Sequence, residues 1–552
     1  MSNQLDFTVG GLLDHIAAKY PENDALIYHE RNLRYNWQQF NDRCRQVAKG
    51  LLKMGVKKGD NLSIWAYNVP EWVTLQFATA KIGAVLVTVN TSYKSAELEY
   101  ILNQSDSTTL FMVNSFKDTD YVATVNEVVP ELAASTPGQL RTAGLPFLKI
   151  VVFIGAETPA GMVNFEAIVK LGESVSDAEL VAVERTLDCH EVINMQYTSG
   201  TTGFPKGVML THHNVVNNGF NIGECMQFTE QDRLCIPVPF FHCFGCVLGV
   251  MACVTHGSAM IPVEIFDPLK VLQTVEKEKC TALHGVPTMF IAELEHPDFA
   301  KFNLSSLRSG IMAGSNCPIE VMKKVISQMN ASEITIAYGQ TESSPVITQT
   351  RTDDAIELRV STVGRALPDV EVKIVDIETG ETLPPGKQGE LCTRGYLVMK
   401  GYYKMPEETA KAIDPEKWLH TGDLAIMDEN GYCKITGRIK NMIIRGGENI
   451  YPREIEEFLY THPKVSDIQV YGVPDRKYGE QVMAAIILKK GVEMTEDEVR
   501  EYCQGKIANY KIPKYVRFVD AYPMTASGKI QKFKLRDMAI KELLLEDAGP
   551  TA

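Results

Sequence analysis

Along the first part of the chain, apolar positions repeat with helical spacing and then give way to short runs of β-branched residues. Helical patterns and apolar runs alternate in the order 36–55, 61–67, 71–83, 84–90, 95–105 and 108–114. Each helical pattern ends at or near a turn-forming residue, in two cases glycine. Such alternation predicts βαβ units that feed a parallel sheet. We therefore expect a doubly wound α/β fold in the N-terminal region.

The same pattern resumes over 148–155 and again from Asn194 to about Ile347. Within the later stretch, four short apolar runs have the composition of strands buried on both faces. These runs are 233–240, 281–286, 307–314 and 334–340. The pattern predicts a second doubly wound parallel sheet in the same large domain.

Between about 355 and 437 the pattern changes to short alternating runs separated by Pro-Pro-Gly, Asn-Gly and Thr-Gly turns. This spacing predicts an antiparallel, β-rich subdomain. A small α+β region follows, with helices expected over 452–462 and after the capping pair Thr495 and Glu498, and strands over 466–473 and 482–490. We expect an N-terminal domain over 1–437, a hinge over 438–440 and a C-terminal domain over 441–552.

Charge and composition narrow the possible partners. The 552 residues include 55 Lys and Arg against 69 Asp and Glu, and a net charge of −14 disfavours nucleic acid as a partner. The longest apolar run, 244–254, is shorter than the roughly 18 residues that a membrane span needs, so only peripheral membrane contact stays open. The N-terminal residues show no secretory or transit pattern, and the twelve scattered cysteines are typical of reduced thiols, so we expect a cytoplasmic protein.

One loop, YTSGTTGFPKGV at 197–208, combines glycines, hydroxyl groups and one lysine. Exposed backbone N–H groups, hydroxyl donors and a cation suit a polyphosphate. The loop is not a Walker A motif, because that motif requires Gly-Lys followed by Ser or Thr. Here Lys206 is followed by Gly207 and Val208. Taken alone, the stretch is better interpreted as a Gly/Ser/Thr surface loop.

Four later segments make the loop more informative. They are AYGQTE at 337–342, HTGDLA at 420–425, GRIKNMIIRGGENIYPREIE at 437–456 and PMTASGKIQK at 523–532. Together with the loop, and in this order, they resemble the adenylate-forming (ANL) superfamily, which includes acyl-CoA synthetases, luciferases and peptide-synthetase adenylation domains. The resemblance covers essentially the whole chain. It implies a large N-terminal domain of two doubly wound parallel sheets and a distorted β-barrel, and a small C-terminal domain that rotates between two half-reactions.

The resemblance also implies roles for individual residues. Lys529, Glu342, Thr198 and His242 would be catalytic, with Glu342 and Thr198 at a Mg²⁺ ion and His242 as a gate to the acyl channel. Nucleotide contacts would come from Thr198, Ser199, Gly200, Thr201, Thr202, Gly203, Lys206, Gly314, Ser315, Tyr338, Gly339, Gln340, Thr341, Asp423, Arg438 and Lys529. Lys440 matches the hinge, and Gly446, Gly447 and Glu448 belong to a segment expected to meet CoA.

Elementary chemistry agrees with these roles without requiring them. Attack of a carboxylate on the α-phosphate of ATP joins two anions, so a divalent metal and lysines must neutralise charge. The Asp423 carboxylate can accept both ribose hydroxyls, since it has about four lone-pair sites. Taken singly, however, Glu342 would more often be a solvated loop residue, Asp423 an Asx-turn and Lys529 an exposed surface lysine.

A metal or redox site is an alternative for one cysteine-containing stretch. It contains His242, Cys243, Cys246, Cys253 and His256, including a C-x-x-C pair. Zinc ligands usually lie on turn-rich loops, whereas these residues lie in an almost continuous apolar run. We interpret them as buried small apolar residues.

The residues around the expected acyl channel bear on the substrate. The segment PVPFFHCFG lacks the Asp that amino-acid adenylation domains usually place there. Gly339 stands where acetyl-CoA synthetases carry a Trp, so we expect an open channel. The expected lining is His242, Phe241, Val286, Met312, Gly339 and Val346. This predicts an ATP-, Mg²⁺- and CoA-dependent ligase of medium- or longer-chain fatty acids.

Two alternatives for the activity stay open at this point. One is an aryl-acid CoA ligase of the coumarate or benzoate type. The other is an acyl-AMP ligase that loads a carrier protein, although we see no extra insertion near the domain boundary. In each case the partner is a small-molecule carboxylic acid with ATP. The chain length of the acid, the physiological direction and a homodimeric state are not decided by the sequence.

Overall fold

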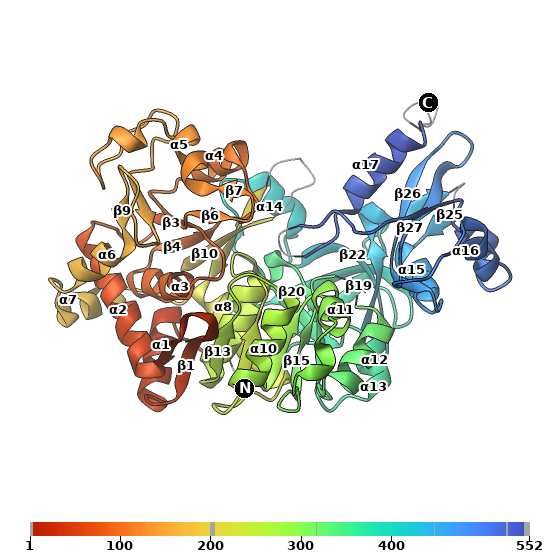
Figure 1. Cartoon of the computed structure of the whole chain (residues 1–552), viewed down its shortest axis with the longest axis horizontal. Coiled ribbons are helices and arrows are strands. Elements are labelled where there is room, and N and C mark those ends of the chain that lie inside the picture. The colour runs from red at the N-terminus through yellow and green to blue at the C-terminus, as the bar shows by residue number, and fades with distance from the viewer. Residues whose placement is uncertain (1–3, 199–204, 316, 446–447, 526–527, 546–552) are drawn as a thin grey trace.

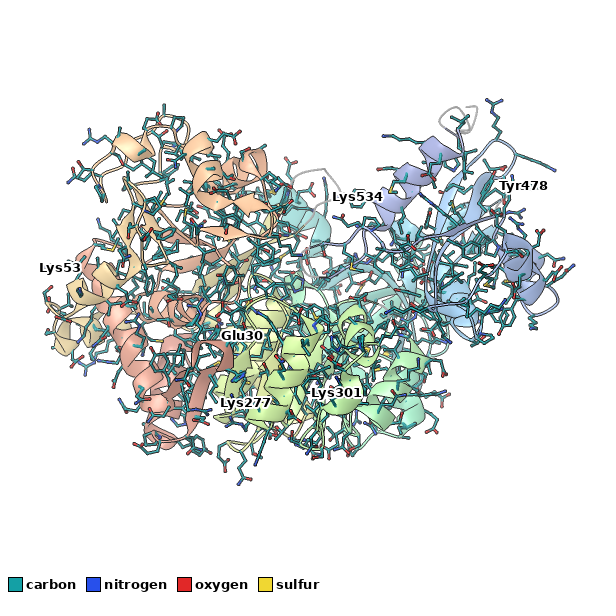
Figure 2. All side chains as sticks on the ribbon, viewed as in Figure 1. Glu30, Lys53, Lys277, Lys301, Tyr478 and Lys534 are labelled. Carbon is teal, nitrogen blue, oxygen red and sulfur yellow. The ribbon has the colours of Figure 1, made fainter. Side chains whose placement is uncertain are left out.

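The computed structural model describes residues 4–198, 205–315, 317–445, 448–525 and 528–545 (Figure 1). Within these ranges the chain forms two large mixed sheets, a smaller antiparallel sheet and a C-terminal α+β lobe. The C-terminal elements lie at the right of Figure 1, away from the N-terminal helices. Charged side chains such as those of Lys53, Lys277 and Lys301 point outward from the surface (Figure 2).

The first large sheet has eight strands in the order β21-β11-β10-β4-β3-β5-β8-β9. Its strands are β3 (Asn61–Trp65), β4 (Val85–Thr88), β5 (Thr109–Met112), β8 (Ile150–Phe153), β9 (Val163–Asn164), β10 (Val192–Thr198), β11 (Lys206–Thr211) and β21 (Gly401–Tyr402). Strands β10, β4, β3, β5, β8 and β9 are parallel, which confirms the α/β pattern of the N-terminal region. Strands β11 and β21 are antiparallel additions.

Helices connect and cover these strands. The N-terminal helices are α1 (Val9–Lys19), α2 (Trp37–Lys53), α3 (Pro70–Ile82), α4 (Ser95–Gln104), α5 (Tyr121–Val128), α6 (Phe165–Gly172) and α7 (Asp177–Glu184). Helix α2 begins at a capping box between Asn36 and Gln39, and Pro70 starts α3 at a position where proline is favourable. All of α3 except Glu71 is buried. A helix that is buried on nearly every side forms part of the central core.

The second large sheet has nine strands in the order β18-β17-β16-β15-β14-β12-β13-β1-β2. Its strands are β1 (Asp24–Tyr28), β2 (Leu33–Asn36), β12 (Arg233–Ile236), β13 (Ala259–Pro262), β14 (Ala282–Gly285), β15 (Ser309–Met312), β16 (Thr335–Gly339), β17 (Val346–Gln349) and β18 (Arg365–Ala366). The four predicted buried runs form the parallel strands β12, β14, β15 and β16. The edges β2, β17 and β18 are antiparallel, so the sheet is mixed rather than wholly parallel.

The helices of this half are α8 (His212–Cys225), α9 (Ala252–His256), α10 (Pro268–Glu278), α11 (Pro287–Leu294), α12 (Ile319–Gln328) and α13 (Ile356–Ser361). The longest apolar run of the sequence forms a π-helix, Phe244–Met251, that leads into α9. Every residue of this π-helix is buried. No helix in the part of the chain that the structure describes has the length and apolarity that crossing a bilayer requires.

The expected β-rich subdomain is an antiparallel sheet in the order β19-β20-β22-β23. Its strands are β19 (Val370–Val375), β20 (Gln388–Gly395), β22 (Leu419–Met427) and β23 (Cys433–Arg438), and α14 (Pro406–Ala412) precedes β22. Strand β23 ends at Arg438, and one turn of 3₁₀-helix, Ile439–Asn441, leads out of it.

The C-terminal lobe follows that turn. Its strands are β24 (Ile443–Arg445), β25 (Glu448–Ile450), β26 (Val465–Asp475), β27 (Gly479–Leu488) and β28 (Tyr515–Phe518), and its helices are α15 (Pro452–Tyr460), α16 (Glu496–Cys503) and α17 (Lys532–Glu542). As predicted, the Thr495 side chain caps α16 by accepting from the backbone of Glu498. The lobe has two apolar clusters of its own, one around Ile468 and one around Val473.

Candidate active site

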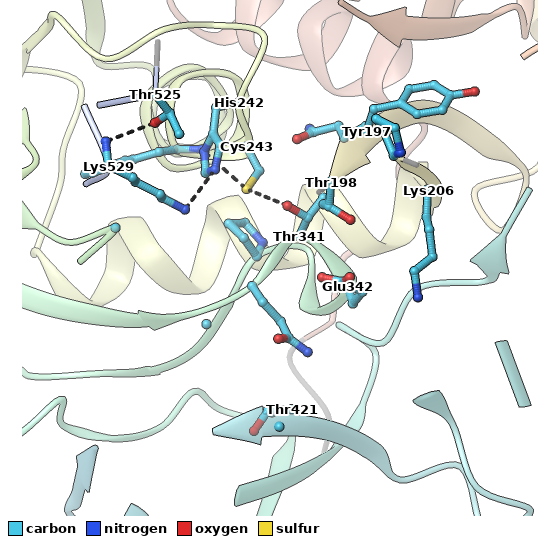
Figure 3. A pocket seen from close by; sticks show the side chains of 18 of the residues that line it. Tyr197, Thr198, Lys206, His242, Cys243, Thr341, Glu342, Thr421, Thr525 and Lys529 are labelled. Atoms are coloured by element: carbon cyan, nitrogen blue, oxygen red, sulfur yellow. Dashed lines mark hydrogen bonds between the residues drawn. The ribbon is translucent and has the colours of Figure 1, made fainter. Parts of the chain in front are cut away.

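A cavity of about 1010 Å³ lies where the carboxyl ends of β10 and β16 face the β22–β23 sheet and the C-terminal lobe. Open α/β folds bind ligands at the carboxyl ends of their strands. Many of the sequence-predicted residues line this cavity, and Figure 3 shows several of them from close by. They are Thr198, Lys206, Phe241, His242, Gly314, Tyr338, Gly339, Gln340, Thr341, Glu342, Val346, Asp423, Arg438, Lys440 and Lys529.

One end of the cavity carries charges suited to phosphate groups. Thr198 is the last residue of β10 and pairs with Lys206, the first residue of β11, so the two lie side by side. The Lys206 ammonium lies 3.0 Å from a carboxylate oxygen of Glu408 and 4.5 Å from the centre of the Tyr402 ring. The predicted phosphate-loop residues Ser199, Gly200, Thr201, Thr202 and Gly203 lie outside the described residues.

Glu342 lies at the same end, in a short 3₁₀ turn after β16. Its Oε1 accepts a hydrogen bond of 2.8 Å from the hydroxyl of Tyr402. Burial and the neighbouring Glu342 carboxylate raise the pKa of Tyr402, so its hydroxyl stays protonated and keeps donating. One carboxylate and the hydroxyl of Thr198, both on the cavity wall, form an oxygen donor set that fits Mg²⁺ together with phosphate oxygens.

The opposite end suits a nucleoside. The Tyr338 hydroxyl donates a 2.8 Å hydrogen bond to Oδ2 of Asp423, whose side chain is almost fully buried. The Arg438 Nε lies 2.7 Å from Oδ1, in a direction that does not make a hydrogen bond. Asp423 and Arg438 are direct partners across β22 and β23. Arg438 balances the charge of the carboxylate, and Oδ1 keeps lone pairs that can accept a hydrogen bond from a ribose hydroxyl.

Further residues of the cavity wall come from three other segments of the chain. Gly314 has a φ of +88°, and an added Cβ there would lie 3.1 Å from Val286 and 3.6 Å from Lys529, so glycine keeps this passage open. The Thr341 hydroxyl lies 3.7 Å from the thiol of Cys243. Ser315, by contrast, is exposed and does not line the cavity.

Lys529 reaches the cavity from the C-terminal lobe. Its Nζ lies 3.3 Å from Nε2 of His242, and its backbone N–H donates to the hydroxyl of Thr525 (Figure 3). The other ring nitrogen of His242 accepts from the backbone N–H of Phe244 at 3.1 Å, which fixes the ring. Burial lowers the pKa of the Lys529 ammonium, and burial and the nearby lysine lower the pKa of His242.

The apolar part of the cavity differs from the expected lining at two positions. Phe241, His242, Gly339 and Val346 line it as expected, whereas Val286 and Met312 do not. Met312 is fully buried in the core of the nine-stranded sheet. Val286 lies behind the cavity, against Gly314 and Gly528. The sequence did not reveal four further lining residues, which are Phe244, Leu248, Ala313 and Ala337.

Gly339 lines the cavity as expected, but the structure gives this glycine a different role. We expected a side chain at this position to fill the channel, and that expectation is wrong. A Cβ on Gly339 would lie 1.8 Å from the backbone oxygen of Pro345. The register between β16 and β17 shifts at this residue, so the Cβ direction of Gly339 departs from the regular strand pattern and points at the backbone of Pro345. The close approach of the Pro345 backbone is sufficient to account for glycine at this position.

The hinge and CoA residues lie at the edge of the site. Lys440 is exposed in the 3₁₀ turn Ile439–Asn441 and reaches the cavity wall. Glu448 is exposed on β25 opposite Arg445, away from the cavity lining. Gly446 and Gly447 lie outside the described residues.

The alternative zinc site is not assembled. Cys246 and Cys253 are fully buried among apolar side chains, and His256 lies 3.1 Å from Glu224. In the described ranges, the groups of three side chains close enough to hold a metal are Asp188, Cys189 and His190, and Glu390, Cys392 and His420. Neither group includes a residue of the 242–256 stretch.

Two residues at the phosphate end were not predicted from the sequence. Tyr402 contacts Glu342 and Lys206, and Glu408 pairs with Lys206. Both lie about 200 residues after Lys206 in sequence, and they reach it because the short β21 pairs with β11. A local sequence pattern does not predict a contact between residues that lie this far apart in the sequence.

Comparison with known proteins agrees with this geometry. Residues 13–403 match the family model described as AMP-binding enzyme, and residues 454–529 match the AMP-binding enzyme C-terminal domain. YngI of Bacillus subtilis (strain 168), whose name gives it provisionally as an acyl-CoA synthetase, is 61% identical over 541 residues, covering 98% of both chains. The mitochondrial medium-chain acyl-CoA ligase ACSF2 of Bos taurus is 42% identical, over 98% of this chain and 88% of its own.

A solved structure shares the whole arrangement. The anthranilate CoA ligase AuaEII, in complex with anthranoyl-AMP, superimposes with a TM-score of 0.86 at 26% identity, covering 98% of this chain and 99% of its own.

Proposed function

The chain belongs to the AMP-binding enzyme family, and from this premise we propose that it is an ATP-dependent acyl-CoA ligase of medium- or longer-chain fatty acids. The reaction converts the acid, ATP and CoA to acyl-CoA, AMP and pyrophosphate through an acyl-adenylate. The observation that carries the proposal is one cavity whose wall combines residues suited to phosphate, residues suited to a nucleoside and apolar side chains with the half-buried Lys529. The names of the relatives at 61% and 42% identity support the same activity.

In the first half-reaction, a carboxylate oxygen of the acid attacks the α-phosphorus of ATP and pyrophosphate leaves. We propose that Lys206 and the Thr198 hydroxyl bind the β- and γ-phosphates, with Lys206 exchanging Glu408 for phosphate oxygens. Lys529 would lie between the carboxylate and the α-phosphate, where a cation stabilises the charge that develops in the transition state. Mg²⁺ held by Glu342 and Thr198 would neutralise part of the triphosphate charge.

The nucleoside would be held by residues of β16 and β22. The Tyr338 ring lies along the cavity wall, where it can pack on the adenine, and its hydroxyl orients Asp423. Asp423 would accept from the ribose hydroxyls, and Arg438 would balance its charge. Because these residues hold AMP as well as ATP, they would act in both half-reactions.

In the second half-reaction, the CoA thiol attacks the acyl carbon and AMP leaves with one oxygen of the original acid. Lys529 has no role in this step, so its lobe is free to move away. We propose that the N-terminal domain covers 1–437, that residues 438–440 form the hinge and that the C-terminal domain covers 441–552. The 3₁₀ turn after β23 and the separate apolar clusters of the C-terminal lobe support this division.

The apolar branch favours an alkyl chain. Its lining includes Phe241, Phe244, Leu248, Ala313 and Val346, which offer van der Waals contact to methylene groups. The ammonium group of an amino acid would meet these apolar side chains without a partner, which is costly. The aryl-acid and carrier-protein alternatives are not favoured, because relatives at 42% identity over almost the whole chain are named medium-chain acyl-CoA ligases.

The test is a panel of carboxylic acids read by pyrophosphate release, with and without CoA. We expect octanoate and longer acids to give a higher kcat/KM than acetate, and CoA to make turnover continuous. Benzoate and coumarate serve as matched aryl acids. A preference for acetate or for an aryl acid would overturn the proposed substrate, and turnover that is indifferent to CoA would overturn the proposed acceptor.

A further inference from the structure

Side-chain hydrogen bonds attach the turn that carries Asp423 to the neighbouring strand β20. Strands β20 and β22 are paired antiparallel, but their register shifts between Glu390 and Cys392. The residues of β22 opposite this irregularity are Thr421, Gly422 and Asp423. Where a ladder is interrupted, backbone N–H groups need other acceptors, because an unpaired buried N–H is costly.

The carboxylate of Glu390 replaces the missing strand acceptor. Its Oε1 accepts a 2.9 Å hydrogen bond from the backbone N–H of Gly422. Gly422 has a φ of +69°, which places its N–H out of the regular strand direction. Next to it, the Thr421 hydroxyl donates to the backbone oxygen of Leu391 at 2.7 Å and accepts from the N–H of Asp423 at 3.1 Å. The turn is thus attached to β20 at two points.

His420 holds the second oxygen of the same carboxylate. Its Nδ1 lies 2.9 Å from Oε2 of Glu390 and 3.4 Å from the thiol of Cys392, and its Nε2 lies 3.8 Å from Asp414. The Glu390 side chain is only 14% exposed. A carboxylate with a partner on each oxygen is fixed in orientation, and hydrogen bonds to a charged group are the stronger kind.

The consequence reaches the nucleotide end of the cavity. Gly422 is directly followed by Asp423, and Leu419, His420, Thr421 and Gly422 line the same cavity as Asp423. The Asp423 carboxylate accepts a hydrogen bond from Tyr338 at Oδ2 and lies 2.7 Å from the Arg438 guanidinium at Oδ1. The backbone of the turn determines where this carboxylate meets those two partners.

We propose that Glu390 is a positioning residue for the nucleotide, which sets the orientation of Asp423 toward the ribose, and that His420 holds Glu390 in place. Neither residue touches the reacting atoms. The inference rests on the proposed function, because the ribose is that of ATP and AMP.

The experiment measures AMP and ATP binding by calorimetry, and KM and kcat separately, for Glu390→Ala and Glu390→Gln. Loss of a hydrogen bond to a charged group predicts about a tenfold to hundredfold weaker AMP affinity and a matching rise in KM for ATP for Glu390→Ala. The KM for the acid should not change. Glu390→Gln keeps an oxygen that accepts from Gly422 and should stay within about threefold of the wild type.

A second pair tests His420. The side-chain amide of His420→Asn can donate from nearly the position of Nδ1, so it should retain AMP affinity, whereas His420→Ala should lose part of it. Glu371→Ala is the matched control, because Glu371 lies on the same sheet and pairs with Arg394 of β20 without contacting the turn. Thermal unfolding of each variant separates loss of binding from loss of fold.

The outcomes distinguish the two proposals. If the wild type binds neither ATP nor AMP, the proposed function is wrong. If the wild type binds AMP and folded Glu390→Ala binds it equally well, the positioning role is wrong. Loss of kcat with unchanged AMP affinity, or equal loss in Glu390→Gln and Glu390→Ala, would also overturn it.

Discussion

The ammonium nitrogen of Lys529 lies 3.3 Å from Nε2 of His242, so the C-terminal lobe and the loop after β12 meet inside one cavity (Figure 3). Burial lowers the pKa of both groups. Two basic groups at this distance disfavour a positive charge on both of them. A carboxylate entering between them would restore the charge of the lysine, which links acid binding to the protonation of Lys529.

Replacement of this lysine separates the two half-reactions. We expect Lys529→Ala to slow acyl-adenylate formation at least about a hundredfold, because removal of one preorganised donor to developing charge has this order of effect. Thioester formation from supplied acyl-AMP should stay near the wild-type rate. Lys541→Ala, at the exposed end of α17, is the control and should change neither rate. Equal losses in both half-reactions would show that Lys529 acts through the fold.

The lowered pKa of Lys529 predicts a pH dependence with a defined sign. A lysine whose pKa is lowered by burial loses its proton at a lower pH than an ordinary lysine, whose pKa is about 10.4. The kcat/KM of adenylation should therefore fall as pH rises through that lowered pKa. Arginine stays protonated, so residual adenylation by Lys529→Arg should lack this alkaline decline. If Lys529→Arg retains the alkaline decline, a group other than Lys529 causes it.

Asp423 should govern nucleotide affinity in both half-reactions. Asp423→Ala removes the acceptor of the ribose hydroxyls, and we expect about a tenfold to hundredfold loss of affinity for ATP and for AMP. Calorimetry with each nucleotide measures the loss directly. Tyr338→Phe is the graded comparison, because it removes only the hydroxyl that orients Asp423, and it should weaken binding less. Unchanged AMP affinity in Asp423→Ala would remove this residue from the site.

Two substitutions in the β16–β17 pair should behave differently. Gly339→Ala forces a Cβ against the backbone of Pro345, so we expect lower thermal stability and similar losses with every acid. Val346→Phe adds volume at a buried residue of the cavity lining, and two backbone hydrogen bonds to Asn218 hold the strand in place, so we expect the ring to reduce the cavity. It should shift preference toward shorter acids, by about 1–3 kcal/mol for each methylene excluded.

The acid panel used for the wild type measures both variants. A shift toward acetate in stable Gly339→Ala would restore the original interpretation of this glycine as the opening of the channel. An unchanged preference in Val346→Phe would place the acyl chain elsewhere in the cavity.

The elements with strong local patterns were predictable from the sequence. The helix at 36–55 and the strand run at 307–314 appear as α2 and β15 because helical and strand periodicity report burial directly. The antiparallel edges β11 and β17 were not predicted, since an apolar run alone does not reveal strand direction. Their direction depends on pairing with β10 and β16 in space.

The site residues that belong to a sequence motif were predictable. The site residues that are brought to the cavity only by tertiary contacts were not. Asp423 and Lys529 could be identified from Thr-Gly-Asp and Ala-Ser-Gly-Lys, and they line one cavity. Met312 and Val286 were assigned to that cavity because they are apolar and near a motif, but strand orientation turns Met312 into the core. Glu390 gave no sequence signal, because its role depends on a register shift between two strands.

The proposed reaction passes through an acyl-adenylate. Octanoate labelled with oxygen-18 in its carboxylate, incubated with the enzyme, ATP and CoA, tests it by mass spectrometry of the AMP released. If a carboxylate oxygen attacks the α-phosphorus and the CoA thiol later displaces AMP, each AMP carries one labelled oxygen. We expect this singly labelled AMP. Unlabelled AMP, or label recovered in phosphate or pyrophosphate instead, would contradict it.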